Sequence, residues 1–177
     1  MNQLAKNKMS SAMQVGDDNS NKYLTFLLGS EVYAFSILKV KEIIEYGDIT
    51  SMPMMPDFIC GAINLRGKVV PVIDLSLRME KAAADISRRT CIVIVELSTG
   101  DGVINIGVII DSVSKVVDLQ ADEIEPAPSF GGNIRTDFIE GMGKLENEFI
   151  IVLNLDRVIS MDDIQALTQV QQLADES

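Results

Sequence analysis

The chain has 177 residues, of which 47% are hydrophobic and 23% charged, a balance typical of a soluble globular protein with a sizeable core. Its 26 acidic and 15 basic residues give a net charge of −11, which opposes sequence-independent binding to nucleic acid or to an anionic membrane surface. Histidine is absent, which excludes imidazole-based triads, histidine-ligated metals and a phosphoacceptor histidine.

The N-terminal residues 1–21 are polar and contain no continuous apolar stretch of the kind found in secretion signals. We expect them to form a disordered tail. No apolar run approaches the ~18 residues that span a bilayer, so we expect no direct membrane insertion and a cytoplasmic protein. Cys60 and Cys91 are too far apart for a CxxC site and are expected to be small buried hydrophobes in a reducing compartment.

The first predicted elements are a hairpin and a short helix. Apolar patterns over Tyr23–Leu28 and Val32–Phe35, around the turn Gly29-Ser30, predict two antiparallel strands. Ser36 is a suitable helix cap, and we predict that a helix follows over Ile37–Tyr46.

The apolar residues of this predicted helix cover an arc of about 220°, whereas a helix with one buried face needs roughly 100°. Two interpretations stay open. The helix is either wedged deeply into the core, or it leaves one edge, around Val40 and Ile43, for a partner. Glu42 lies next to that edge and could orient a basic residue.

Residues 49–56 (ITSMPMMP) predict a loop, in which the methionines either close the end of a core or offer an adaptable partner surface. Residues 61–65 and 68–75 then predict a second hairpin. Pro71 lies within the second of these runs and indicates an edge strand or a bulge. A charged linker is expected over residues 80–89.

The second half of the chain predicts further strands and a terminal helix. Ser160 with Asp163 is typical of a capping box, so we expect a helix over residues 160–175 with apolar positions Ile164, Leu167, Val170 and Leu173. The strands are predicted at Cys91–Leu97, Val103–Asp111, Val113–Leu119 and Phe149–Leu155.

An internal repeat relates the two halves. Residues 57–75 (DFICGAINLRGKVVPVIDL) align without a gap on residues 137–155 (DFIEGMGKLENEFIIVLNL), with seven of nineteen positions identical, where chance gives about one. Upstream, residues 33–44 resemble residues 106–117. Short, closely spaced strands in two similar halves predict two small β-barrels rather than a parallel α/β sheet.

The repeat separates what the fold needs from what it does not. Both copies keep the lead-in Asp-Phe-Ile-x-Gly and the apolar strand positions, which we assign to folding. Asn64 and Arg66 become Lys144 and Glu146 in the second copy, while the turn residue Gly67 becomes Asn147, which also tolerates positive φ. The sequence therefore predicts that Arg66 is displayed for a partner.

Catalytic motifs are not found. The chain has neither GxxxxGK[ST] nor GxGxxG after a strand, which argues against nucleotide binding. The acidic residues along Asp118–Glu125 are interpreted as solvated turn and strand ends. We expect no enzyme activity, no metal and no cofactor. A small-molecule-binding or catalytic β-barrel is the alternative from another class, and it predicts a deep polar pocket with convergent ionisable groups.

The stretches FLLGSEVYAF, ILKVKEI, GAINLRGKVVPVIDL, GVIIDSV and IEPAP together resemble the CheW family of chemotaxis coupling proteins, in order over residues 23–160. The resemblance implies a mostly β fold: two similar five-stranded SH3-like barrels around a shared core, with a few short helices and a C-terminal helix. We assign residues 22–160 to the CheW-like domain, with subdomain 1 at about 22–80 and subdomain 2 at about 90–156.

The same resemblance implies a non-enzymatic adaptor. Such a protein binds the cytoplasmic tip of methyl-accepting chemotaxis receptors and the regulatory domain of the histidine kinase CheA, and so puts kinase autophosphorylation under receptor control. It points to Arg66, Asn64, Val40 and Glu42 as receptor-binding residues, and Ile43 lies at the same edge; the kinase-binding residues stay unassigned. The coupling protein of a non-flagellar chemosensory array is the nearest alternative.

Overall fold

The computed structural model describes residues 19–79, 84–100, 102–126 and 138–175. Strands dominate this part of the chain. They are β1 (Lys22–Leu28), β2 (Glu31–Ser36), β3 (Val40–Glu45), β4 (Ile59–Leu65), β5 (Lys68–Asp74), β6 (Cys91–Thr99), β7 (Gly102–Ile110), β8 (Ser112–Asp118), β9 (Ile124–Glu125), β10 (Ile139–Leu145) and β11 (Glu148–Leu153). The helices are η1 (Asn19–Asn21), η2 (Ile37–Lys39), α2 (Leu75–Arg78), η3 (Ala121–Glu123), α3 (Leu155–Val158) and α4 (Met161–Asp175).

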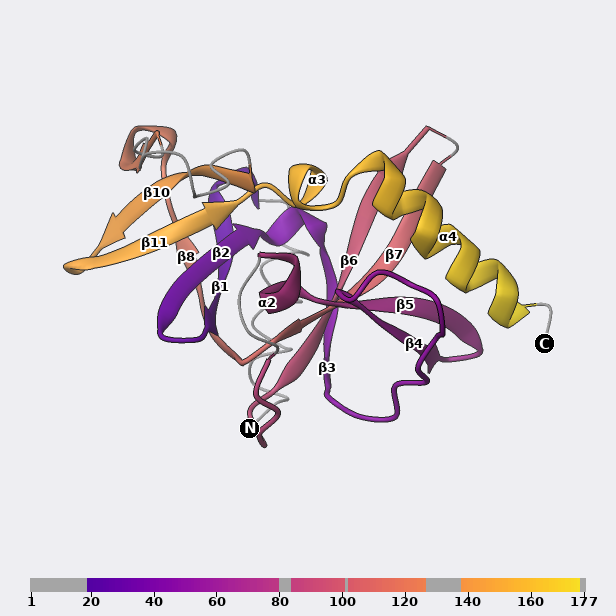
Figure 1. Cartoon of the computed structure of the whole chain (residues 1–177). Coiled ribbons are helices and arrows are strands. Elements are labelled where there is room, and N and C mark those ends of the chain that lie inside the picture. The colour runs from indigo at the N-terminus through magenta and orange to yellow at the C-terminus, as the bar shows by residue number, and fades with distance from the viewer. Residues whose placement is uncertain (1–18, 80–83, 101, 127–137, 176–177) are drawn as a thin grey trace.

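The strands form two sheets that lie side by side, with α2 and α3 in the region between them (Figure 1). The central sheet has the order β3-β6-β7-β5-β4, and the terminal sheet has the order β8-β1-β2-β11-β10-β9. Helix α4 packs against β4 and β5 of the central sheet. The prediction of a mostly β fold with two similar β subdomains is confirmed, and the sixth strand of the terminal sheet is the two-residue β9.

The two halves of the sequence are structural repeats, but each sheet takes its first hairpin from the other half. The β1–β2 hairpin joins the terminal sheet, where β2 pairs in parallel with β11, and the β6–β7 hairpin joins the central sheet, where β7 pairs in parallel with β5. The sheets therefore do not follow the predicted split into residues 22–80 and 90–156. Long-range pairing of this kind leaves no local pattern in a sequence.

The register of the β4–β5 and β10–β11 hairpins confirms the repeat. Leu65 pairs with Lys68 and Leu145 with Glu148, and both hairpins have an irregularity at the start of their first strand. Beside these bulges, Thr50 bridges to Ala62 in one half as β9 pairs with β10 in the other. The backbone that the two copies share therefore includes their irregular features.

The predicted helix Ile37–Tyr46 is wrong. Ser36 does act as a cap, because its hydroxyl accepts a hydrogen bond from the backbone N–H of Leu38 at 3.2 Å. The helical turn η2 then ends at Lys39, and the chain continues as the edge strand β3, paired with β6. Val40, Ile43 and Ile44 are β-branched, which favours the extended conformation in a run this short.

Among the described residues, three apolar clusters stabilise the fold. A large core shared by both sheets contains Phe26 and Phe35, whose ring centroids are 4.8 Å apart, together with Val93 and Ile106 of the central sheet. Each sheet also has its own smaller cluster, in which matched residues such as Val72 and Val152 are fully buried. The shared core buries apolar surface from both sheets, and this burial favours their association.

The structure places Pro71 and the methionines of residues 49–56 largely as the sequence predicts. Strand β5 is not an edge strand as a whole, but its pairing with β7 begins at Val72, directly after Pro71. Met52 and Met55 are half-buried and pack against the shared core, which is the core-closing role. Met54, at φ 62°, is fully exposed.

The ends of the described chain fit their predictions in part. Residues 1–18 of the predicted tail lie outside the described residues. Residues 19–21, also predicted to be disordered, form η1, where the carbonyl of Asn21 accepts from the N–H of Leu119 at 2.8 Å. The C-terminal helix is confirmed as α4, and Leu167 and Val170 are completely buried under it.

Candidate functional site

The turn between β4 and β5 displays Arg66. Arg66 and Gly67 have φ values of 52° and 84°, and Leu65 pairs with Lys68, which is the geometry of a two-residue hairpin turn with both residues left-handed. The side-chain oxygen of Asn64 accepts the N–H of Gly67 at 2.9 Å. The side chain of Arg66 is 73% exposed. A polar side chain thus closes the turn, and the guanidinium is presented to solvent.

Arg66 makes a two-pronged ion pair with Glu42. Nη1 donates to Oε1 at 3.3 Å, and Nη2 donates to Oε2. Hydrogen bonding to Glu42, and then its negative charge, raise the pKa of the Arg66 guanidinium. The prediction that Glu42 orients a basic residue therefore has a structural counterpart, and that basic residue is Arg66.

This ion pair joins the two edges of the central sheet. Glu42 lies on β3, Arg66 directly follows β4, and these two strands are the outer strands of the sheet. The pair therefore bridges the gap across which the sheet would close into a barrel. A guanidinium has five N–H donors, and Glu42 occupies two nitrogens of the exposed side chain, so donors are left for a carboxylate or carbonyl of a partner.

The matching turn of the terminal sheet carries the opposite charge. Glu146 and Asn147 have φ values of 50° and 67°, close to those of the first turn. Lys144 replaces Asn64 and lies with its Nζ 6.0 Å from the ring centroid of Phe149, which is 61% exposed. One backbone turn therefore presents a cation in the central sheet and an anion in the terminal sheet.

The remaining predicted residues divide into surface and core. Ile43 is half-buried and packs against the shared core, so part of its side chain is accessible. Val40 is 1% exposed and pairs with Val95 of β6. Of the two interpretations left open for this segment, Val40 fits burial in the core and not a partner-facing edge. The edge was derived from helical spacing, which the chain does not adopt, and the family resemblance pointed to the same residue.

Two features near this edge were not found from the sequence. Leu38 is 59% exposed on η2, directly before β3. Lys39 pairs with Asp156 of α3 at 3.3 Å and so links η2 to the other half of the chain. The wide apolar arc of residues 37–44 was the signal for an exposed apolar residue here, but it was interpreted on the wrong secondary structure.

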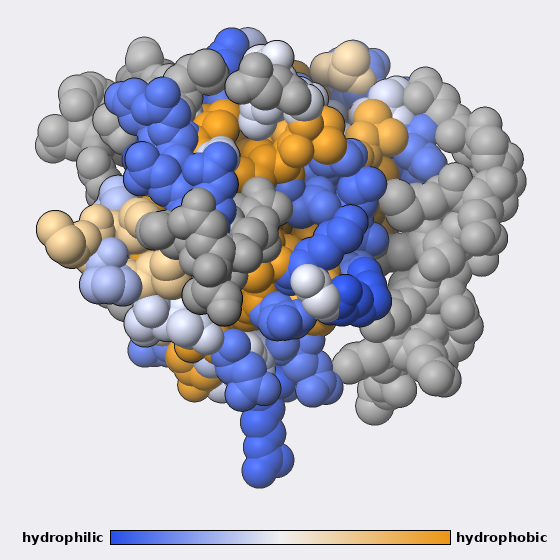
Figure 2. Space-filling view, turned by 90° about the vertical axis from the view of Figure 1, so that its right-hand side faces the viewer, coloured by the Kyte–Doolittle hydropathy of each residue, from blue (hydrophilic) through white to orange (hydrophobic). Residues whose placement is uncertain are grey.

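The side of the molecule that carries α4 and the β4–β5 hairpin has a mixed surface. Figure 2 shows hydrophilic residues around and between apolar ones on this side. Two further apolar residues are exposed. Val103 is 64% exposed at the start of β7, and Met54 is fully exposed in the loop of residues 49–56.

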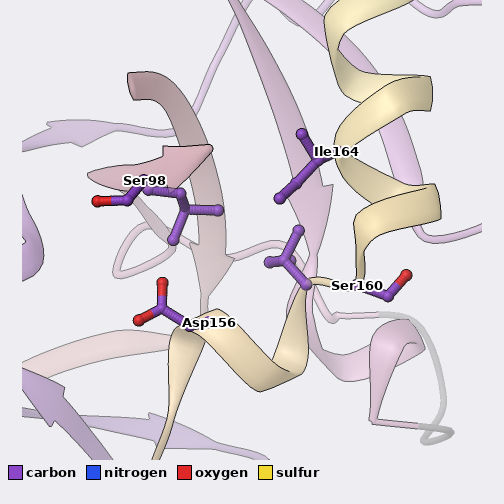
Figure 3. Close-up of a pocket in the computed structure, with 6 residues that line it drawn as sticks. Ser98, Asp156, Ser160 and Ile164 are labelled. Carbon is purple, nitrogen blue, oxygen red and sulfur yellow. The ribbon is translucent and has the colours of Figure 1, made fainter. Parts of the chain in front are cut away.

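A pocket of about 380 Å³ lies where the end of β6 meets α3 and the start of α4 (Figure 3). Its lining is mostly apolar, and Asp156, the one charged residue among the described lining residues, is already paired with Lys39. The Ser160 hydroxyl is turned away from the pocket and accepts from the N–H of Asp163 at 3.2 Å. The convergent ionisable groups expected of a catalytic or polar ligand-binding barrel are not found in this pocket.

The cysteines are free and half-buried in the structure. Burial, and then the negative charge of Asp74, raise the pKa of the Cys60 thiol to about 11. Within the described ranges, no cluster of three or more His, Cys, Asp or Glu side chains is placed to hold a metal ion. No described helix is long and apolar enough to cross a membrane.

The structure thus combines two similar β subdomains about a shared core with an arginine displayed on a tight turn. A family model described as the CheW-like domain matches residues 22–163. The chain therefore belongs to the CheW-like family, whose members are coupling adaptors of bacterial chemotaxis.

Individual relatives agree with this assignment. The chain is 34% identical to the chemotaxis protein CheW of Klebsiella aerogenes over 155 residues, which cover 88% of this chain and 91% of the relative. It is also 34% identical to the CheW protein of Bacillus subtilis over 82% of this chain and 90% of that one. The crystal structure of the scaffolding protein TtCheW from Thermoanaerobacter tengcongensis matches with a TM-score of 0.72 and 34% identity, over 85% of this chain and 94% of that chain.

Proposed function

We propose that this protein binds the cytoplasmic tip of methyl-accepting chemotaxis receptors through the surface around Arg66, and that it binds the regulatory domain of the kinase CheA at the same time. By joining the two, it puts kinase autophosphorylation under receptor control without catalysing a reaction of its own. It works in the cytoplasm, and its partners hold it at the membrane.

The observation that carries this proposal is the asymmetry between the two turns. Folding explains the positive φ values, the register and the apolar positions, because both copies have them. It does not explain a forked cation on one turn and an anion on the other. A helical receptor tip offers carboxylates and carbonyl groups, which suit a guanidinium, and apolar positions, which suit the accessible part of Ile43.

The proposed receptor-binding surface consists of Arg66, Asn64, Glu42 and Ile43. Asn64 closes the turn and so aims Arg66, and Glu42 holds the guanidinium on the β3 side. Val40 supports β3 from the core and does not belong to the surface. The exposed side chain of Leu38, on η2 just before β3, offers a further apolar contact to a partner that binds at this strand.

Reconstitution tests the function directly. Receptor-containing membranes, purified CheA and this protein are combined, and autophosphorylation of CheA is measured with and without the receptor's ligand. We expect kinase activity to become receptor-dependent only when the protein is present. Receptor-independent kinase activity in the complete mixture would contradict the proposal, provided that sedimentation shows the two partners to be intact.

A further inference from the structure

Arg78, the last residue of α2, ties three helices together. Its side chain is 15% exposed, so the guanidinium is largely withdrawn from water. Nε donates to the backbone carbonyl of Val158, at the end of α3, at 2.8 Å. Nη2 pairs with the Asp163 carboxylate in the first turn of α4 at 3.2 Å. One side chain therefore connects α2 to the end of one helix and the beginning of the next.

The same guanidinium lies over two phenylalanine rings. Its Cζ atom is 5.2 Å from the ring centroid of Phe58 and 4.9 Å from that of Phe138. These residues occupy the same position in the two repeats, directly before β4 and before β10. Distances below about 6 Å are in the range of attractive cation–π contacts. The phenylalanines of the two lead-in motifs therefore contact the same side chain, that of Arg78.

Both phenylalanines are fixed in the same way. The carbonyl of Phe58 accepts the N–H of Asp74 at 2.7 Å, and the carbonyl of Phe138 accepts the N–H of Asn154 at 2.9 Å. Asp74 and Asn154 are the caps of α2 and α3. Each lead-in is therefore attached to its own short helix, and Arg78 joins the two assemblies.

Arg78 lies where the two copies of the repeat meet. Val158 is the counterpart of Arg78 in the repeat, at the same offset of 80 that relates Phe58 to Phe138. A residue that contacts its own counterpart, and both members of a matched pair, must lie where the two copies meet. The second copy has valine at this position, so a single guanidinium serves both copies.

We propose that Arg78 is a positioning residue that fixes the orientation of the two sheets relative to each other and seats the first turn of α4. The shared apolar core favours association of the sheets but is not directional. A planar guanidinium with two fixed partners and two aromatic neighbours is directional. The consequence for signalling rests on the proposed function: the Arg66 turn belongs to the central sheet, so Arg78 sets its place relative to the other half.

The test measures a distance between the sheets without any partner. Cys60→Ala and Cys91→Ala remove the native thiols, and Lys68→Cys and Glu148→Cys allow spin labels at matched, exposed positions of the two hairpins. Pulsed electron–electron double resonance then gives the distance distribution between the spin labels at positions 68 and 148. The distribution is recorded for the labelled protein that retains Arg78, called the Arg78 background, and for the same protein with Arg78→Met, Arg78→Lys or Arg157→Met. The last is the matched control, an exposed arginine on α3.

We expect a narrow distribution in the Arg78 background and in Arg157→Met, a broader and shifted one in Arg78→Met, and an intermediate one in Arg78→Lys, because an ammonium keeps the charge but loses the fork. Hydrogen exchange of amides within β1–β2 and β6–β7 is recorded in parallel and should not change. An unchanged distribution in a folded Arg78→Met variant would overturn the proposal. Should Arg78→Met fail to fold, Arg78→Lys decides: broadening supports the proposal, and a background-like distribution overturns it.

A second measurement separates this inference from the proposed function. Arg78→Lys is added to the receptor and kinase reconstitution, with binding of each partner measured separately. We expect each binary complex to form with at least half of the original affinity while receptor control of the kinase is weakened, and undiminished control would count against the signalling role of Arg78. The distance result tests the role of Arg78 even where no receptor control is seen with the unaltered protein, so the failure of one proposal is distinguishable from the failure of the other.

Discussion

Arg66 and Glu146 occupy the same backbone position in two copies of one hairpin, at φ values of 52° and 50°, and carry opposite charges. Because the two turns have the same backbone conformation, comparing them separates the residues that folding requires from those that it does not. What the turn requires for folding is present in both copies. What Arg66 adds to the first copy is a guanidinium held by Glu42 at the edge of the central sheet.

Exchanging the charges of the ion pair separates stability from recognition. The double variant Glu42→Arg with Arg66→Glu retains an ion pair between β3 and the β4–β5 turn but moves the guanidinium off the turn. Since both positions are accessible, we expect the midpoint of thermal unfolding to stay within about 2 °C of the original. Receptor co-sedimentation should fall to the level that we expect for Arg66→Ala alone. Full receptor binding by the exchanged variant would show that only the ion pair matters.

Gly61 is expected to be intolerant of any side chain. Its φ is 148°, and a Cβ atom there would lie 1.9 Å from the backbone oxygen of Thr50. Gly61→Ala should therefore lower the free energy of unfolding by about 3 kcal/mol or more, measured by urea denaturation. The control is Gly67→Asn, because Asn147 already occupies the matching left-handed position at φ 67°. The control should cost less than about 1 kcal/mol, and equal losses would contradict this account.

Cys60 gives a pH dependence of known sign. Its pKa is about 11 in the folded protein, above the ordinary value of 9.0, because burial and the charge of Asp74 disfavour the thiolate. The folded state therefore holds its proton where the unfolded state loses it, and this contribution to stability, complete below pH 9, is lost as the pH rises from 9 to 11. We expect Cys60→Ala to flatten the fall in unfolding midpoint over this range.

Thiol labelling checks the same shift by a second route. In Cys91→Ala protein, alkylation of Cys60 at pH 8 should be slower in buffer than in denaturant, because the thiolate is the reactive form. Equal rates in buffer and in denaturant, corrected with a model thiol, would contradict a raised pKa.

Ser160 is expected to stabilise α4 by capping. Its hydroxyl accepts from Asp163 N–H at 3.2 Å, and its own N–H donates to the Asp163 carboxylate at 2.8 Å. Ser160→Ala should cost about 1 kcal/mol of unfolding free energy in urea denaturation. Ser98→Ala, at an exposed position on the other side of the same pocket, is the control and should change little. A loss of the same size in both variants would argue against the cap.

Local signals were enough to predict most strands and the two hairpins within residues 23–35 and 61–75, whereas β10 (Ile139–Leu145) was not predicted. The turn Gly29-Ser30, the alternation around residues 65–68 and the capping pair at Ser160 each depend on neighbours in sequence, and each is found in the structure. The strand at Cys91–Leu97 is found as β6, which runs on to Thr99.

The error over residues 37–46 shows where local reasoning is weak. A short apolar run satisfies both helical and extended patterns. The sequence did contain the evidence to decide, since residues 33–44 resemble residues 106–117, and the counterpart of β3 was predicted as a strand at Val113–Leu119. Applying the repeat to secondary structure would have given a strand from Val40.

Other features depend on contacts that sequence patterns do not record. The exchange of first hairpins between the halves results from parallel pairing of β2 with β11 and of β5 with β7. The pairing of Arg66 with Glu42 spans 24 residues and the edges of a sheet. Arg78 was not singled out, because its four partners are brought together only when both repeats are folded.

The most direct measurement compares Arg66→Ala with Glu146→Ala in binding to a purified receptor cytoplasmic fragment. Both variants truncate the same turn position, so their effects on folding should be alike. We expect the dissociation constant to rise roughly tenfold for Arg66→Ala and to stay unchanged for Glu146→Ala, with both proteins unfolding at nearly the original temperature. Equal receptor affinities for the two folded variants would contradict the claim that Arg66 is displayed to bind the receptor.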